Sequence, residues 1–556
     1  MNRYRLLFSI ILLLYFSPCL RAGEWQWSVT LDGFVSNETN RNPTAFLWIP
    51  ADCMQVKAIL VGQHNMSEET LFDNPLFREK MQKLGIGFVW ITPGIDQQWD
   101  VSKGTQRIFE KMMADLADVS GYSELKNVPI VPIGHSAMAT YPWNFAAWNA
   151  ERTLAVISLH GDAPRTNLTG YGRENLEWGR TRNINGIPGL MIEGEYEWWE
   201  ARVNPALAFR MMYPESCISF LCDAGRGHFD VADETAAYIA LFLEKAVCLR
   251  LTDEVTKDGK VKLNPINPTK GWLAERWHPN QKKRAKAAFY SQYKGDVHDA
   301  FWYFDREMAE ATEARYVQSR GKEEQYLGFE QSGSLLAYDK KQHVRVQPRF
   351  NPKADGITFH LKAVCTDSLR TKLSDEHADA TPTISRICGP VEKVNDTTFK
   401  VSFYRMGMDN PRRTGDICLL ASQTGDRRYK SAVQEVSIRI PYRNTAGERQ
   451  HILFPGLPDV ETGSGSLSLK ATSDCGLPVS YYIKEGPAEI EGDQIVFTPI
   501  PPRSKFPVKV TVVAWQYGVA GKVQTAEPVE RSFYIKKELI LKSATKLFSV
   551  LLASKR

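Results

Sequence analysis

The stretch Val131-Pro-Ile-Gly134-His135-Ser136-Ala137-Met138-Ala139 decides the fold predicted for this chain of 556 residues. An apolar run at 128–133 leads into it, and a helix-like stretch at 140–149 follows it. Gly134 lets the backbone turn sharply from a strand into a helix, which places the Ser136 hydroxyl at the rim of a sheet. The N–H groups that begin the helix can stabilise an oxyanion there. The pattern indicates a nucleophilic serine.

Short apolar runs surround this motif between residues 23 and 248, and helical patterns separate them. The later runs are continuous rather than alternating, which is typical of strands buried on both faces. The repetition of strand and helix predicts an α/β domain with a doubly wound, mostly parallel sheet, which begins with a hairpin. The runs are 25–31, 45–49, 58–62, 87–92, 128–133, 154–159, 189–192 and 217–222, and the helical stretches include 105–116 and 235–247.

A serine hydroxyl needs a base within hydrogen-bond reach, and the base needs an orienting carboxylate. We predict His228 as the base, because it lies in a glycine-bearing turn directly after the run 217–222. His64 and His160 also follow apolar runs, but both precede the expected acid in the chain order serine, acid, histidine. His135 is adjacent to the serine and is expected to point away from it.

The acid is predicted from the segment that follows the run 189–192. Glu197, three residues after Gly194, is the first choice, because an acid a few residues past this strand would reach a histidine on the neighbouring strand. Glu195 is the first alternative. Asp162, which follows the preceding run, is the second.

The oxyanion hole needs two backbone N–H donors. Ala137, the residue after the serine, is predicted to supply one of them. The other is predicted at Gln63, in the loop after the run 58–62, and one position on either side, including His64, is left open. The chain has no HExxH, P-loop or CxxC pattern, so neither a cofactor nor a metal ion is predicted.

The remainder of the chain divides into five further segments. Residues 1–22 carry Arg3 and Arg5 before a short apolar run, which is typical of a signal peptide and too short to span a membrane comfortably. Residues 249–328 are predicted to form a helical extension on the catalytic domain, with a helix at 297–316. Alternating patterns predict a β-rich domain at 329–445 and a β-sandwich at 459–537, and 538–556 reads as an amphipathic tail.

Composition and charge argue against nucleic-acid binding as the main task. The chain has 69 basic and 64 acidic residues, a net charge of +5, which is too balanced for a protein whose main task is to bind nucleic acid. Its hydrophobic content of 43% is that of a folded globular protein. Eight cysteines follow the signal peptide, and their spacing does not distinguish disulfides from free thiols.

Residues 23–248 resemble an α/β-hydrolase, with Gly134-His-Ser-Ala137 at the serine and Gly227-His-Phe229 at the base. Met138 stands where a small residue is usual in that family. With the export signal and the β-rich remainder, the whole chain resembles secreted carbohydrate esterases of gut Bacteroidetes, in particular those of the pectin-methylesterase type. The stretch 474–533 resembles the immunoglobulin-like modules of bacterial secreted enzymes. The resemblance implies the periplasm or cell surface of a Gram-negative bacterium.

Arginines and tryptophans cluster after the sixth and seventh runs of the predicted sheet. Guanidinium groups suit carboxylates, and aromatic faces suit sugar rings, so this cluster favours an anionic sugar polymer as substrate. A solvated basic loop with structural aromatics is the alternative. The residues predicted to bind substrate are Arg165, Arg180, Arg182, Trp198 and Trp199, and Arg202 lies in the same region.

The leading hypothesis is a secreted serine esterase that hydrolyses ester groups on plant cell-wall polysaccharide, with methyl esters of uronic acids in pectin as the first choice. An acetyl or feruloyl esterase of polysaccharides uses the same site and is the first alternative. A secreted serine peptidase is the second, because the same triad cleaves amides. A glycan-binding protein with a degenerate hydrolase domain is the third. The expected partner is a polysaccharide or oligosaccharide substrate.

Overall fold

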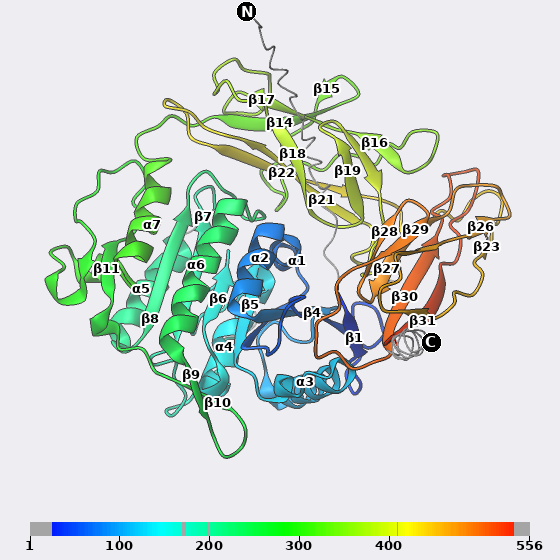
Figure 1. The fold of residues 1–556 in the computed structure, drawn as a ribbon. Helices are drawn as coiled ribbons and strands as arrows, with labels where there is room; N and C mark the ends of the chain where they lie inside the picture. Colours follow the sequence, from blue (N-terminus) through cyan, green and yellow to red (C-terminus); the bar gives the residue numbers. More distant parts are fainter. Residues whose placement is uncertain (1–24, 169–173, 198–199, 409, 539–556) are drawn as a thin grey trace, which may run out of the picture.

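The computed structural model describes residues 25–168, 174–197, 200–408 and 410–538 (Figure 1). The predicted signal peptide and nearly all of the predicted tail lie outside these ranges. None of the helices within them combines the length and apolar content that crossing a membrane requires. The eight cysteines that follow the predicted signal peptide are all free thiols.

An eight-stranded sheet forms the N-terminal domain, with the strand order β1-β2-β4-β3-β5-β6-β7-β8. The β1–β2 hairpin is antiparallel and β2 runs antiparallel to β4, whereas all pairs from β4 to β8 are parallel. Each strand overlaps one of the eight apolar runs of the sequence. The strands are β1 Trp27–Thr30, β2 Thr44–Trp48, β3 Ala58–Gln63, β4 Ile86–Thr92, β5 Ile130–His135, β6 Val156–Leu159, β7 Pro188–Gly194 and β8 Cys217–Asp223.

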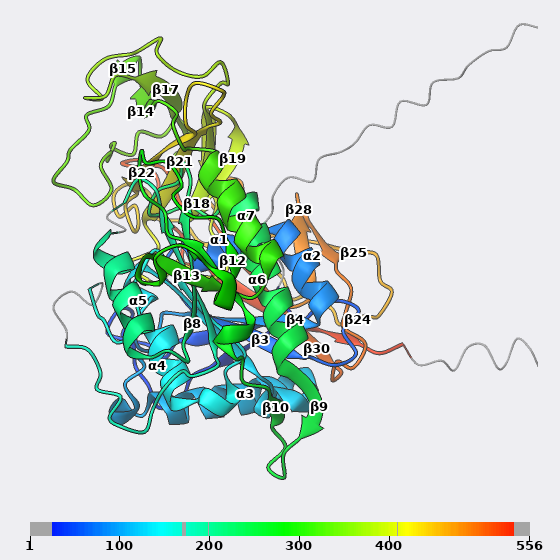
Figure 2. The ribbon, with the colours of Figure 1, turned by 90° about the vertical axis from the view of Figure 1, so that its left-hand side faces the viewer.

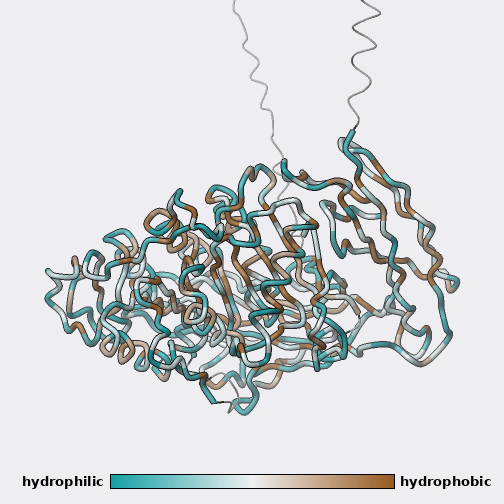
Figure 3. Tube along the Cα trace, turned by 90° about the horizontal axis from the view of Figure 1, so that it is seen from below, coloured by the Kyte–Doolittle hydropathy of each residue, from teal (hydrophilic) through white to brown (hydrophobic). Residues whose placement is uncertain are grey.

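Both faces of this sheet are apolar because helices cover both. In β4, Phe88 and Trp90 enter one core with α2 and α6, while Val89 and Ile91 enter the other with α3 (Figure 2). This explains why the runs in the sequence are continuous. Figure 3 shows hydrophobic segments through the middle of the molecule. The helices are α1 Ser67–Asp73, α2 Pro75–Leu84, α3 Thr105–Ser120, α4 Tyr141–Trp148, α5 Glu200–Met212 and α6 Asp233–Arg250.

A mostly parallel sheet with this strand order, helices on both faces and a sharp turn after β5 is the α/β-hydrolase fold. In open parallel sheets, functional groups gather at the carboxyl ends of the strands. The ends of β5, β7 and β8 therefore define where the site lies.

The segment at 249–328 differs from the helical extension predicted for it. It forms a three-stranded sheet, β12-β11-β13, and a single long helix, α7 (Arg306–Val317), which begins where the Asp305 side chain accepts the Met308 N–H at 3.0 Å. The aromatic residues before it favour a strand, and Tyr303 donates its hydroxyl to the Phe220 carbonyl of β8 at 2.7 Å. The strands are β9 Leu251–Val255, β10 Val261–Leu263, β11 Trp272–Glu275, β12 Ala288–Phe289 and β13 Ala300–Tyr303.

Mostly antiparallel sheets form the rest of the described chain, as the alternating patterns predict, and β24 and β31 are a parallel pair. We call 326–440 the β-rich module and 452–536 the terminal sandwich. They share a core, in which the rings of Phe403 and Trp515 lie 4.8 Å apart. The module contains β14 Tyr326–Gln331, β15 Ser334–Leu335, β16 Thr358–His360, β17 Lys362–Thr366, β18 Thr383–Cys388, β19 Val391–Asn395, β20 Thr398–Val401, β21 Asp416–Gln423 and β22 Ala432–Arg439.

The terminal sandwich consists of a four-stranded and a three-stranded sheet around their own apolar core, together with a short two-stranded ladder of β23 and β26. It fits a β-sandwich. Its strands are β23 Ile452–Leu453, β24 Val460–Glu461, β25 Ser466–Ser468, β26 Thr472–Ser473, β27 Ser480–Glu485, β28 Ala488–Glu491, β29 Gln494–Phe497, β30 Val508–Trp515 and β31 Val529–Lys536.

Buried charges attach the β-rich module to the catalytic domain. Glu69 of α1 pairs with Arg386 of β18, and its other oxygen accepts the Tyr404 hydroxyl at 2.8 Å. Glu195 pairs with Lys430 at 2.9 Å, and neither side chain is more than 5% exposed. Removing one partner of such a pair strongly destabilises the fold, because the charge left behind is buried and unpaired. The module is therefore held at one position above the sheet (Figure 1).

Replacing Glu69 tests this attachment. Glu69→Ala leaves the Arg386 guanidinium and the Tyr404 hydroxyl without their shared acceptor, and we expect the free energy of unfolding to fall by about 3 kcal/mol in urea denaturation. Glu79→Ala, which removes an exposed ion pair with Lys83 on α2, is the matched control and should cause no measurable loss. Equal stability of the two variants would contradict the role given to the buried pair.

Candidate active site

The serine stands on a strained turn at the end of β5. Ser136 begins a short 3-10 turn (Ser136–Met138) and has a φ of 51°, in the left-handed region that side chains rarely adopt. A Cβ at Gly134 would lie 2.0 Å from the Met138 carbonyl oxygen, so only glycine fits there. Met138 occupies the position where the family has a small residue, and the room for its side chain comes from Gly94, whose Cβ would lie 2.6 Å from the Met138 Cε.

Three side chains from the ends of β5, β7 and β8 form one hydrogen-bonded chain. The Ser136 hydroxyl lies 2.8 Å from His228 Nε2. His228 Nδ1 lies 2.5 Å from Glu197 Oε2. Since the carboxylate accepts the Nδ1–H, Nε2 carries the lone pair that faces the serine. The structure thus brings together the three residues named first from the sequence.

The carboxylate of Glu197 is buried and held from several sides. Its Oε1 accepts the Gly194 N–H at 2.6 Å and the Nδ1–H of a second histidine, His160, at 2.5 Å. Arg202 Nη1 lies 3.4 Å from Oε2. Burial by itself would raise the pKa of Glu197, but the two imidazoles hold it well below its ordinary value. Glu197 therefore carries a negative charge at neutral pH.

The basicity of His228 results from two opposed effects. Burial lowers the pKa of His228, and the charge of Glu197 raises it, with the first effect prevailing. The imidazole is therefore neutral at pH 7 and able to accept a proton. His135 supports it from behind, because its Nε2 donates to the His228 carbonyl at 2.8 Å, and Asn65 donates to His135 Nδ1 at 3.2 Å.

The two alternative acids serve other partners. Glu195 accepts the Gly225 N–H at 2.9 Å and pairs with Lys430 of the β-rich module. Asp162 accepts the Thr140 hydroxyl at 2.6 Å. Of the three candidate acids, only Glu197 accepts the hydrogen bond of His228 Nδ1.

His160 is a residue whose place the sequence did not reveal. The sequence offers it only as a weaker candidate for the base, whereas in the structure it donates to the same carboxylate as His228. Its φ is 49°, and its Nε2 is buried with no hydrogen-bond partner among the described residues. Burial opposes protonation, but the charge of Glu197 prevails and raises the pKa of His160. Its position directly after β6 was the one available signal.

The second oxyanion donor is predicted at Gln63 or His64, and the structure offers Asn65, the next residue, as a further candidate. The Gln63 side chain turns away to bind the backbone of Ile95 and Asp96, and Gln63 does not line the cavity at Ser136. The His64 N–H donates to the Ile91 carbonyl at 2.7 Å. The backbone N–H of Asn65, the next residue, has no acceptor among the described residues, and Asn65 lines that cavity.

Ala137 remains in the position expected of the first donor. It is the second residue of the 3-10 turn, so its N–H has no acceptor within the turn. It lines the same cavity as Ser136 and Asn65.

Two cavities meet at the triad, and both lie between the catalytic domain and the β-rich module. One of about 690 Å³ contains Ser136 and Ala137. The other, of about 250 Å³, contains Glu197 and His228. They share Phe229 of the catalytic domain and His343 of the module, whose ring lies 5.3 Å from that of His228. His343 lies between β15 and β16 in an exposed stretch with no motif, so the sequence had no signal for it.

The predicted arginine cluster lies elsewhere. Arg165 stacks on Trp178 and Tyr213, and Arg182 stacks on Trp148 with its guanidinium 4.6 Å from the ring centre. Neither they nor Arg180 are among the residues that line the two cavities. Arg202 is buried between Glu193 and Glu197 and acts within the site's ion pairs. The predicted Trp198 and Trp199 lie outside the described residues.

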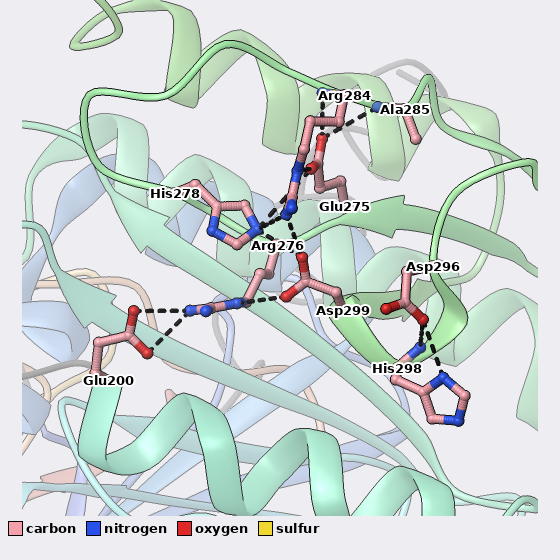
Figure 4. Close-up of polar contacts among 9 residues, drawn as sticks. All are labelled: Glu200, Glu275, Arg276, His278, Arg284, Ala285, Asp296, His298 and Asp299. Atoms are coloured by element: carbon pink, nitrogen blue, oxygen red, sulfur yellow. Dashed lines mark hydrogen bonds and ion pairs between the residues drawn. The ribbon is translucent and has the colours of Figure 1, made fainter.

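Two groups of side chains have the spacing of metal ligands. His160, Glu197 and His228 form one, whose atoms already make the hydrogen bonds of the triad. The other is Glu275, His278 and Asp299 in the extension, and Figure 4 shows guanidiniums at its carboxylates. The bonds are Arg284 Nε to Glu275 at 2.6 Å and Arg276 Nε to Asp299 at 2.6 Å. Two cations already neutralise these acids, so the group reads as an ion-pair network.

No family model and no curated protein matches this chain. Solved structures similar to part of it include FphF, a fluorophosphonate-binding serine hydrolase of Staphylococcus aureus, at 11% identity and a TM-score of 0.28 over 40% of this chain and 99% of that one. Est1E from Butyrivibrio proteoclasticus has 15% identity and a TM-score of 0.27, over 40% and 100%. An esterase of Pyrobaculum calidifontis has 12% and 0.30, over 41% and 87%.

The turn at the serine predicts a stability effect. In Gly134→Ala, the new Cβ meets a backbone oxygen that cannot move aside cheaply, so we expect the free energy of unfolding to fall by about 2 kcal/mol or more in urea denaturation. Gly465→Ala is the control, because nothing lies within 4 Å of a Cβ there. The account of the turn is wrong if the two variants unfold at the same urea concentration.

Proposed function

We propose that this protein is a serine hydrolase that cleaves carboxylic esters through an acyl-enzyme. One observation carries the proposal: Ser136, His228 and Glu197 are joined by hydrogen bonds of 2.8 and 2.5 Å at the wall of an accessible cavity. A serine is a weak nucleophile until a positioned base takes its proton. The neutral imidazole of His228 is such a base.

In the first half of the reaction, Ser136 Oγ attacks the ester carbonyl carbon and its proton passes to His228 Nε2. The charge of Glu197 stabilises the imidazolium that forms. The developing oxyanion is stabilised by the N–H groups of Ala137 and Asn65. When the C–O bond breaks, His228 returns the proton to the leaving alcohol, and the acyl group stays on Ser136.

In the second half, water attacks the acyl-enzyme. His228 takes a proton from the water, the new C–O bond forms, and the bond to Ser136 Oγ breaks. The serine recovers its proton from His228 and the carboxylic acid leaves. Each proton is transferred through the same Nε2, so one buried carboxylate serves both halves.

For the substrate, we propose methyl esters of uronic acids in pectin, with methanol leaving first. The support is the resemblance of the whole chain to exported carbohydrate esterases. The cavity of about 690 Å³ also lies within the usual volume range of pockets that bind small ligands, about 300–1,000 Å³. The same resemblance supports export to the periplasm or cell surface and an immunoglobulin-like character for the terminal sandwich. The cluster at Arg165, Arg180 and Arg182 lies outside the cavities and gives the proposal no support.

Product release tests the reaction and the substrate together. Wild-type protein should release methanol from methyl-esterified pectin faster than it releases acetate from acetylated pectin, and a fluorophosphonate should label it at Ser136. Ser136→Ala should lower kcat at least 10³-fold and abolish labelling, because the nucleophile is gone. Acetate release in excess of methanol release would reject the methyl ester, and absence of both together with absence of labelling would reject the hydrolase.

The acid has a separate test. Glu197→Gln keeps the shape of the side chain but removes the charge that stabilises the imidazolium, so kcat should fall about 10³- to 10⁴-fold with p-nitrophenyl acetate. Glu200→Gln, three residues later, alters an exposed pair with Arg276 and should keep kcat. Equal losses in the two variants would remove Glu197 from the mechanism.

A further inference from the structure

The cavity that contains Ser136 has two walls of different origin. The catalytic domain contributes His64, Asn65, Ser136 and Ala137. The β-rich module contributes most of the facing wall. A substrate that reaches the serine must therefore also contact the module. The module's part of this wall includes His343, Arg349, Arg413, Asp416 and Arg439.

The module wall has a fixed position relative to the serine. Besides the buried pairs of Glu69 and Glu195, the Asn410 side chain donates to Glu38 of the catalytic domain at 2.6 Å. On the wall itself, the His343 ring packs against Phe229 at 5.0 Å, directly beside the proposed base. The wall is a constructed side of the site.

The charge on this wall is positive. Three arginines line the cavity, whereas Asp416 is the single carboxylate among the described residues that line it. Asp416 pairs with Arg439 at 2.8 Å, and Arg413 lies 3.6 Å from Glu38. The Arg349 guanidinium is exposed and forms no ion pair or hydrogen bond with any residue that the structure describes. One positive charge in the cleft therefore has no counter-charge from the residues that the structure describes.

The arrangement of these arginines suits an extended anion. Arg349 is paired with Arg439 of β22 by an isolated parallel bridge, so the two side chains leave the backbone at adjacent positions of the wall. A guanidinium binds a carboxylate through two parallel N–H···O bonds, which gives both affinity and orientation. A methyl-esterified unit at Ser136 is itself neutral, so the carboxylates available to the wall belong to neighbouring, unesterified units of a polymer.

We propose that the β-rich module is part of the substrate-binding site, and that Arg349, with Arg413 and Arg439, binds free carboxylates of an acidic oligosaccharide beside the ester at Ser136. This inference rests on the proposed function and narrows it to partly de-esterified chains. The arginines lie in a part of the chain that the sequence assigned to a separate β domain, between 213 and 303 residues after the serine.

Direct binding tests the inference without any need for turnover. Trigalacturonate, which has no ester to cleave, should bind the full-length wild-type protein in isothermal titration calorimetry, and cellotriose, a neutral sugar of the same length, should bind at least tenfold more weakly. Arg349→Ala should weaken the binding of trigalacturonate about tenfold, because a charged hydrogen bond is lost. Arg349→Lys should recover part of the affinity, since the charge is kept and the fork is lost.

The matched control is Arg427→Ala, an exposed arginine of the same module that lines neither cavity, and it should bind like the wild type. Thermal unfolding of each variant shows that the module stays folded. The inference is overturned if the wild type does not bind trigalacturonate, if cellotriose binds equally well, or if Arg349→Ala and Arg427→Ala bind alike. The release assay with pectin fails or succeeds independently, so trigalacturonate binding without Ser136-dependent hydrolysis would reject the proposed function alone.

Discussion

The structure depends on one buried carboxylate. Glu197 lies between the imidazoles of His160 and His228, and the Gly194 N–H and the Arg202 guanidinium complete its surroundings. A carboxylate so far from water is tolerated only when its oxygens are satisfied. These contacts provide that, and the same contacts fix the ring of His228 with its lone pair toward Ser136. The Glu197 carboxylate thereby connects the side chains that follow β5, β7 and β8.

The second constraint is the attachment of the β-rich module. Had the module been joined by a polar linker, the cavity at Ser136 would be an open edge of a sheet. Instead, two buried ion pairs join the catalytic domain to the module, Glu69 with Arg386 and Glu195 with Lys430. These pairs fix the two walls of the cleft relative to each other. The extension at 249–328 packs against the edge strand β8 of the main sheet, where Tyr303 donates its hydroxyl to the Phe220 carbonyl.

The sequence predicted the catalytic domain well because its signals are local. Continuous apolar runs and amphipathic helices can be recognised from about ten neighbouring residues. Gly134, two residues before Ser136, meets a steric requirement that no other residue meets. The helix predicted at 297–316 exists from Arg306 onward but was placed to begin too early, because Tyr303 pairs in a strand of the extension and Asp305 caps the helix after it. Strand pairing depends on residues far away in the chain, which no local pattern contains.

By itself, the sequence determined the parallel sheet, the strained turn at Ser136, and the order in which serine, acid and base follow along the chain. It placed Glu197 before Glu195 as the acid but could not decide between them, since only the direction of each side chain in the folded loop separates them. Nor did it place His160, His343 or Arg349 at the site. These residues come together only when strands distant in the chain align and a second domain packs against the first, because side-chain distances across such contacts are properties of packing.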